Sequence, residues 1–320
     1  MVFYPDNEKR ASRLQQLVDS MANMQTDVKQ IGKKMDDKNT EYRPAINALL
    51  EANGMDSVDD VINKAASQMT PEERKAYEAL IQTVRDNKAG FDTTYFVAGL
   101  LMVPEGVILS GKMSLTIARW ATRMVNVNAI ANFFKATEGG TEAAAAAAEE
   151  IASMAEEAEK TLEEAGEVGE EVSEAATILG RVGTFFKVLG AVGLVITLIA
   201  GVIELIEGAE QKKELIDAIH GLQPSRLTTA FFKQEGTNIM QQLVTLKLYL
   251  DASPGGSNPD PVIAAYVAKE LIDAITKENA AIDLNQLESD LETQDRTSDL
   301  FYGGDDLSHD NVVFTASKAD

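Results

Sequence analysis

The sequence predicts an all-α protein, built as an elongated bundle of long amphipathic helices with a hydrophobic head segment. Three observations lead to this prediction. Apolar residues recur in steps of three and four over long stretches, which is the spacing of one helix face. No stretch of any length alternates apolar and polar residues as a half-buried strand does. One uncharged stretch, Val188–Ile203, would be apolar all round as a helix, so it must be buried in a core or in lipid.

Residues 1–90 are predicted to form the N-terminal helices of the bundle. Asn53-Gly54 supplies a stop for the first helix, and Ser57 can cap a short helix to about Met69. Thr70-Pro71-Glu72-Glu73 has the composition of a capping box, which indicates the start of another helix. The apolar face of the long first helix is formed by Leu14, Leu17, Met21, Met24, Val28, Ile31 and Met35.

Residues 91–135 contain a first apolar block and an amphipathic helix. The block, Phe91–Ser110, is interrupted by Pro104-Glu105-Gly106. Each half is too short to cross a bilayer alone, so the block is predicted to be a bent hairpin or two short buried helices. Met113–Phe134 follows as the amphipathic stretch.

Residues 138–250 are predicted to form a long helix, an apolar segment and a second long helix. Gly139-Gly140 marks the boundary, and Glu138–Glu174 holds thirteen Glu and a single Lys, which is typical of a solvated helix face. The uncharged Val188–Ile203 would be about 24 Å long as a helix, short of a ~30 Å hydrocarbon core. The longer Val182–Ile206 would reach across. It is interpreted as the buried core helix of a bundle, as a conditional membrane-inserting element or as a constitutive membrane span, and the lack of a charge asymmetry across it argues against the last.

The helical pattern then continues to a predicted break at Pro224 and resumes with Ser225 as the cap. Leu227–Leu250 is the second long helix, and Ser253–Pro261 is a loop. Residues 261–291 are predicted to be C-terminal helices, the last of them short and ending at Leu291. Residues 292–320 are predicted to be an irregular acidic tail.

Composition limits the classes of partner. The chain has 320 residues and a formal net charge of −22, which argues against nucleic acid and against electrostatic docking on anionic lipid. It has no Cys, so no disulfide or thiol chemistry contributes. The first residues lack the plan of a signal peptide. We therefore expect a soluble protein that leaves the cell, if it does, by an unconventional route and then associates with membranes.

Residues that carry catalytic chemistry are sparse. The two histidines are His220, near a predicted helix end, and His309, in the acidic tail beside Asp305 and Asp306. His309 and its neighbours are interpreted as a solvated tail, with adventitious cation binding as the alternative. We expect no enzyme activity, no cofactor and no metal.

The candidate functional residues are those of the Val182–Ile206 segment. Its glycines and threonine fall four apart on one face, which lets helices approach closely; these residues are Gly193, Thr197 and Gly201. The candidates for membrane insertion are Val182, Phe185, Phe186, Val188, Leu189, Val192, Leu194, Val195, Ile196, Leu198, Ile199, Val202 and Ile203.

This layout resembles the cytolysin A-like α-pore-forming toxins, through Leu14–Met35, Ile151–Leu179, Val182–Ile206 and Leu227–Leu250. In plan, one long helix rises to an apolar segment and another returns from it. A second similarity is to apolipoprotein L-like proteins, which place an apolar hairpin among amphipathic helices. The resemblance implies a protein that exposes its apolar head, inserts into a lipid membrane and forms a homo-oligomer, with a second protein component left open. Either Phe91–Ser110 or Val182–Ile206 can be that head. The alternative is a non-enzymatic structural or interaction protein whose bundle binds a protein partner.

Overall fold

A computed structural model describes residues 6–52, 56–67, 69–86, 126–136, 140–164, 209–252, 274, 277–278, 281–298 and 303–317. Every regular element in these ranges is a helix, and no strand occurs among them. The all-α class is therefore confirmed, and the chain is a helical bundle. The first apolar block, the Val182–Ile206 segment and most of the predicted helix after Pro261 lie outside the described residues.

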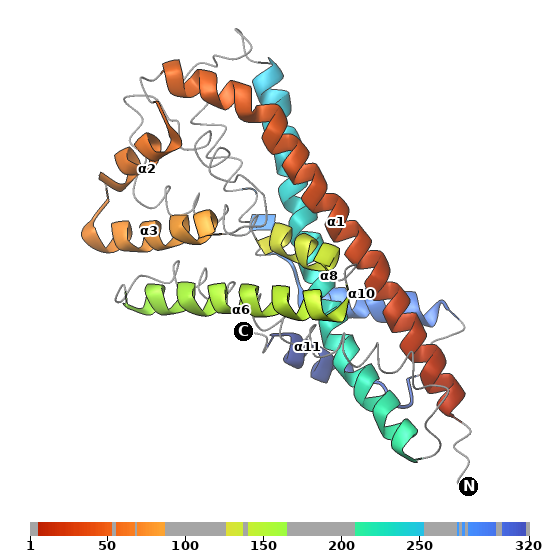
Figure 1. Ribbon diagram of the computed structural model, residues 1–320. Helices are drawn as coiled ribbons and strands as arrows, with labels where there is room; N and C mark the ends of the chain where they lie inside the picture. Colours follow the sequence, from red (N-terminus) through yellow and green to blue (C-terminus); the bar gives the residue numbers. More distant parts are fainter. Residues whose placement is uncertain are drawn as a thin grey trace.

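The bundle is organised around two long helices, α1 (Asn7–Ala52) and α8 (Ala209–Ala252), which lie side by side (Figure 1). At 46 and 44 residues, each is roughly 65–70 Å long. Arg226 Nε donates to Ser20 Oγ at 2.8 Å, and Lys233 pairs with Asp27 at 2.6 Å. Residue numbers rise together along both helices, so α1 and α8 are parallel.

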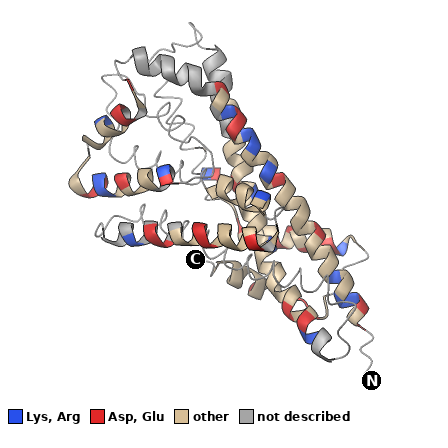
Figure 2. Cartoon of the chain, in the orientation of Figure 1, with Lys and Arg blue, Asp and Glu red and all other residues tan. Residues whose placement is uncertain are grey.

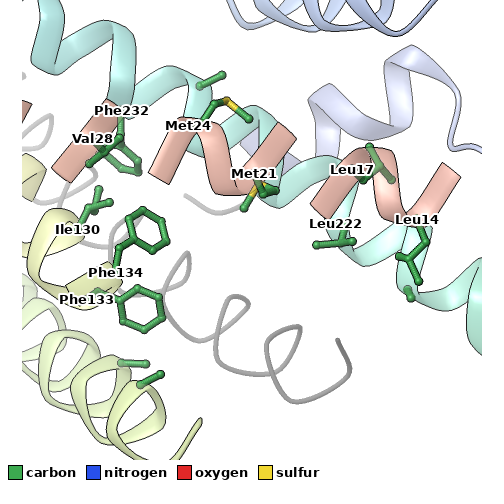
Figure 3. Close-up of a cluster of buried hydrophobic side chains, with 14 of the residues drawn as sticks. Leu14, Leu17, Met21, Met24, Val28, Ile130, Phe133, Phe134, Leu222 and Phe232 are labelled. Atoms are coloured by element: carbon green, nitrogen blue, oxygen red, sulfur yellow. The ribbon is translucent and has the colours of Figure 1, made fainter. Parts of the chain in front are cut away.

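The apolar face predicted for α1 is confirmed as the centre of the core. All seven of its apolar residues from Leu14 to Met35 are buried. Figure 3 shows Leu222 and Phe232 of α8 among the same buried side chains. The outer surface of α1 carries interspersed basic and acidic residues (Figure 2). The three–four spacing thus gives α1 one apolar face toward α8 and one charged face toward water.

A third helix, residues 126–136, closes the core at the point where glycines let the helices approach. A Cβ atom added to Gly32 would lie 2.7 Å from the Cβ of Ala131. A Cβ atom added to Gly236 would lie 3.0 Å from both Ile31 and Val127 side chains. These glycines are therefore required by contact between α1, α8 and the third helix, and Phe133 and Phe134 add an edge-to-face pair to the core (Figure 3).

Helix α6 (Thr141–Glu164) begins against the long pair and runs away from it at a steep angle (Figure 1). The boundary predicted at Gly139-Gly140 lies directly before the first residue of α6. Gly140 has a φ of 104°, a backbone conformation that favours glycine. Ala144 and Ala148 join the core while Glu149 and Glu150 are exposed. The sequence predicted that the long helix before the apolar segment would pair with the long helix after it. In the described residues α8 packs along α1 and not along α6.

Two shorter helices, α2 (Val58–Ser67) and α3 (Pro71–Asp86), extend from the bundle, with α3 against α6 (Figure 1). Both begin where capping residues predict. Thr70 N donates to Glu73 Oε2 at 3.0 Å, and Glu73 N donates to Thr70 Oγ1 at 3.3 Å. This reciprocal pair is a capping box.

The C-terminal region differs from the prediction. Helix α10 (Leu284–Arg296) extends beyond Leu291, and the predicted irregular tail contains a second helix, α11 (His309–Ser317). The side chain of Asp283 caps α10 by accepting from Asn285 N at 2.8 Å. Val312 and Ala316 of α11 are buried against Leu227 of α8. Tertiary contact with α8 therefore orders a stretch whose own composition has little helical periodicity.

The predicted break at Pro224 is also wrong, because α8 passes through this residue without ending. Proline in a helix interior removes one backbone hydrogen bond and costs about 3 kcal/mol. Around it, residues 222–230 are all buried. The burial of two turns against α1 and the C-terminal helices outweighs that cost.

Candidate functional site

The described residues include one concentrated group of buried and half-buried charges, where α1, α8, α10 and the loop before α11 meet. We call it the clasp cluster. Charged side chains are rarely buried unless they are paired, so a group of this size indicates a specific role. Its members are Arg10 and Arg13 of α1, Arg226 of α8, Glu288 and Asp295 of α10, and Asp305 and Asp306 of the loop.

Asp295 is the centre of the cluster. Arg226 binds it in a bidentate manner, with Nη1 at 2.7 Å from Oδ2 and Nη2 at 2.9 Å from Oδ1. Arg13 Nη1 donates to the same Oδ2 at 2.8 Å. The side chain of Asp295 is only 3% exposed. One buried carboxylate therefore joins two guanidinium groups that come from different helices.

The acidic loop supplies the remaining partners. Asp305 Oδ2 accepts from Arg10 Nε at 2.6 Å. Asp306 lies across Arg13, with Oδ2 at 3.0 Å from Nη2. Residues that resemble a solvated acidic tail in the sequence are thus ion-pair partners of the first helix.

Two side chains of α8, one turn apart, hold the backbone of this loop. His220 Nε2 lies 2.8 Å from the carbonyl oxygen of Asp305. A carbonyl only accepts, so this nitrogen is the donor. Gln223 Oε1 accepts from Leu307 N at 2.9 Å. His220 is therefore a structural contact for the loop.

Burial dominates the electrostatics of the two carboxyl groups at the edge of the cluster. Burial raises the pKa of Glu288 to about 7, and the nearby Arg226 opposes this shift. Burial likewise raises the pKa of Asp306, with Arg13 opposing it. The three guanidinium groups of the cluster face four carboxyl groups. Retaining a proton on one carboxyl group removes the excess negative charge.

The chemistry available to this site is ion pairing and proton binding. Asp295, Asp305 and Asp306 use their oxygens on arginines. In the part of the chain that the structure describes, no group of three or more His, Asp or Glu residues could hold a metal ion. His309, predicted to lie in a solvated tail, is the first residue of α11.

The sequence contains one indication of this site, which is that arginines occupy positions on otherwise apolar helix faces. Arg10 lies four residues before Leu14 on the buried face of α1, and Arg226 lies four residues after Leu222 on α8. An arginine on an otherwise apolar face requires a buried acidic partner. The partners are more than 60 residues away in the chain, so spacing within one helix could not identify them.

The predicted functional segment is not part of this site. All the residues proposed for membrane insertion, and the small residues Gly193, Thr197 and Gly201, lie outside the described residues. None of the helices within the described ranges combines the length and the hydropathy that a membrane crossing requires.

Comparisons with protein-family models, with curated proteins and with solved structures gave no significant match for this chain.

Proposed function

We propose that this protein permeabilises membranes in the manner of a pore-forming toxin. It folds first as a water-soluble helical bundle. It then exposes an apolar helical segment, inserts that segment into lipid and assembles with further copies of itself.

The observation that supports this proposal is the composition of residues 182–206. Sixteen consecutive residues, Val188–Ile203, have no charge, within a chain of net charge −22. A long helix flanks the segment on each side, since α6 precedes it and α8 follows it. A helix that is apolar all round requires an apolar environment on every side, which either lipid or a protein core provides.

Assembly is proposed to use the small-residue face of the same segment. Gly193, Thr197 and Gly201 fall four residues apart, and such spacing lets helices in lipid pack closely. The target is a membrane recognised through apolar contact, because a strongly acidic chain gains nothing from an anionic lipid surface. A second protein component remains compatible with this mechanism, and nucleic acid is not a proposed partner.

Dye leakage from neutral phosphatidylcholine vesicles tests the proposal, with a charge placed in the segment. In Ile196→Lys the new ammonium group adds about 2.5–3.5 kcal/mol to insertion at the centre of a bilayer. We expect wild-type protein to release dye and this variant to lose most of that activity. Val244→Lys is the matched control, because Val244 is an exposed residue of α8, and it should leak like wild type.

The alternative function, a bundle that binds a protein partner with 182–206 as a core helix, predicts a different pattern. Wild-type protein would then leave vesicles intact, and Ile196→Lys would lower the melting temperature by burying an unpaired charge.

A further inference from the structure

We propose that residues 283–298 and 303–317 act as a pH-dependent clasp, which locks α1 to α8 under acidic conditions and loosens as the pH rises toward and through neutrality. This inference does not rest on the proposed function. It concerns how one end of the bundle is held closed.

The C-terminal segment is necessary for the contact between α1 and α8 around Arg13 and Arg226. Arg13 of α1 and Arg226 of α8 are buried, and each has a guanidinium nitrogen within 2.8 Å of the same Asp295 oxygen. Without Asp295 the two arginines would face each other as like charges with little solvent. Departure of the segment therefore destabilises the α1–α8 contact around these residues.

The apolar contact between this segment and α8 is small. Among the described residues its cluster has three buried members, Leu227, Val312 and Ala316, and five partly buried side chains pack against them: Leu284, Leu287, Leu291, Leu307 and Val313. The main core between α1, α6, α8 and the third helix has seventeen buried members among the described residues. The charged cluster therefore contributes to the attachment of the clasp beside this apolar contact, and the affinity of the clasp for α1 and α8 changes when a charge in that cluster changes.

Glu288 is the group in the cluster whose charge changes near neutral pH. It is 5% exposed. The charged groups acting on it are Arg226 of α8, Glu292 and Asp295 of its own helix, and Arg13 of α1. The face of α10 that meets α11 is apolar, through Leu284, Leu287 and Leu291. Glu288 therefore belongs to a cluster that already contains enough acidic groups to match its arginines.

The direction of the pH effect follows from proton binding. Burial raises the pKa of Glu288 from 4.5 to about 7 in the closed form, so the closed form holds a proton that the open form releases. Between these two values, each rise in pH favours opening, and above about pH 7 the effect is complete. The raised pKa of Asp306 acts in the same direction.

Amide hydrogen exchange of the full chain, corrected for the intrinsic exchange rate at each pH, measures the opening of residues 283–298 and 303–317. We expect the opening constant of wild-type protein to rise about tenfold between pH 6 and pH 8. Residue 288 cannot ionise in Glu288→Gln, so the opening constant of this variant should stay low and lose most of its pH dependence over this range. Asp290→Asn removes an exposed carboxylate from the same helix and should behave like wild type.

Two results would overturn the clasp: an opening constant of wild-type protein that does not change between pH 6 and pH 8, or a Glu288→Gln variant that retains the wild-type slope. If Glu288→Gln fails to fold by circular dichroism, Glu288→Leu replaces it with the same expected result. The wild-type pH profile alone remains sufficient to refute the proposal.

Discussion

At the scale of residues, the stability of the molecule depends on a few buried charges. Each of them is stabilising only while its partners are present. Asp295 is shared by Arg13 and Arg226, so it holds three helices at once. Removing one member of a buried ion pair leaves the others without compensation, which costs more than the pair itself contributes. Loss of Asp295 should therefore be more damaging than loss of a surface charge.

Asp295→Asn tests this expectation. The substitution keeps the size of the side chain and removes the charge that both arginines require. We expect the free energy of unfolding to fall by about 3–5 kcal/mol, measured by urea denaturation at pH 7. Asp290→Asn, on the exposed face of α10, should change it by less than about 0.5 kcal/mol. A loss below about 1 kcal/mol for Asp295→Asn would show that the cluster is not important for stability.

At the scale of elements, the three-four pattern predicted the helices but not the contacts that fix them. The buried face of α1 and the capping box at Thr70 could be predicted, because both depend on residues close together in the chain. Two features could not be predicted from the sequence: the continuation of α8 through Pro224, and the formation of helix α11. Both depend on packing between segments that are distant in sequence, which overrides local propensity.

The glycine contact between α1 and the third helix gives a prediction about packing. In Gly32→Ala the new methyl group would meet the Cβ atom of Ala131 at 2.7 Å. Since neither atom can rotate away, we expect a loss of about 1–3 kcal/mol of stability in thermal or urea unfolding.

A second change on the facing helix should restore part of that loss. Ala131→Gly removes the opposing methyl group, so the double variant should be more stable than the sum of the two single changes predicts. Simple additivity of the two effects would mean that the helices do not touch at this point.

The capping box of α3 gives a smaller, local effect. Thr70→Ala removes the side-chain acceptor for Glu73 N and should cost about 0.5–2 kcal/mol. Thr26→Ala is the matched control, because Thr26 is exposed within α1 and alanine is the better helix former. Equal urea midpoints for the two variants would argue against the cap.

At the scale of the whole molecule, the parallel arrangement of α1 and α8 is the main feature that the sequence did not predict. Two amphipathic helices can pack in either direction, and the choice depends on long-range contacts between buried groups, such as Arg13 and Arg226 with Asp295. It follows that α8 begins at the same end of the bundle where α1 begins. The clasp cluster lies at that end, and the chain enters α8 there directly after the apolar residues 182–206.

This arrangement connects the two proposals without making either depend on the other. The clasp holds the end of the bundle to which the apolar segment is attached. If the segment inserts, the first half of α8 must accommodate the change, and this part of the helix contacts the C-terminal loop through His220 and Gln223. Opening of the clasp at higher pH should therefore make insertion faster at pH 8 than at pH 6, which vesicle leakage at the two pH values measures.

Insertion into membranes and assembly there, as proposed, can be seen by electron microscopy of wild-type protein after incubation with neutral vesicles. We expect ring-shaped oligomers on the vesicles, and none in a parallel sample of Ile196→Lys. Wild-type particles that stay unbound and unassembled in the presence of vesicles would contradict the proposal.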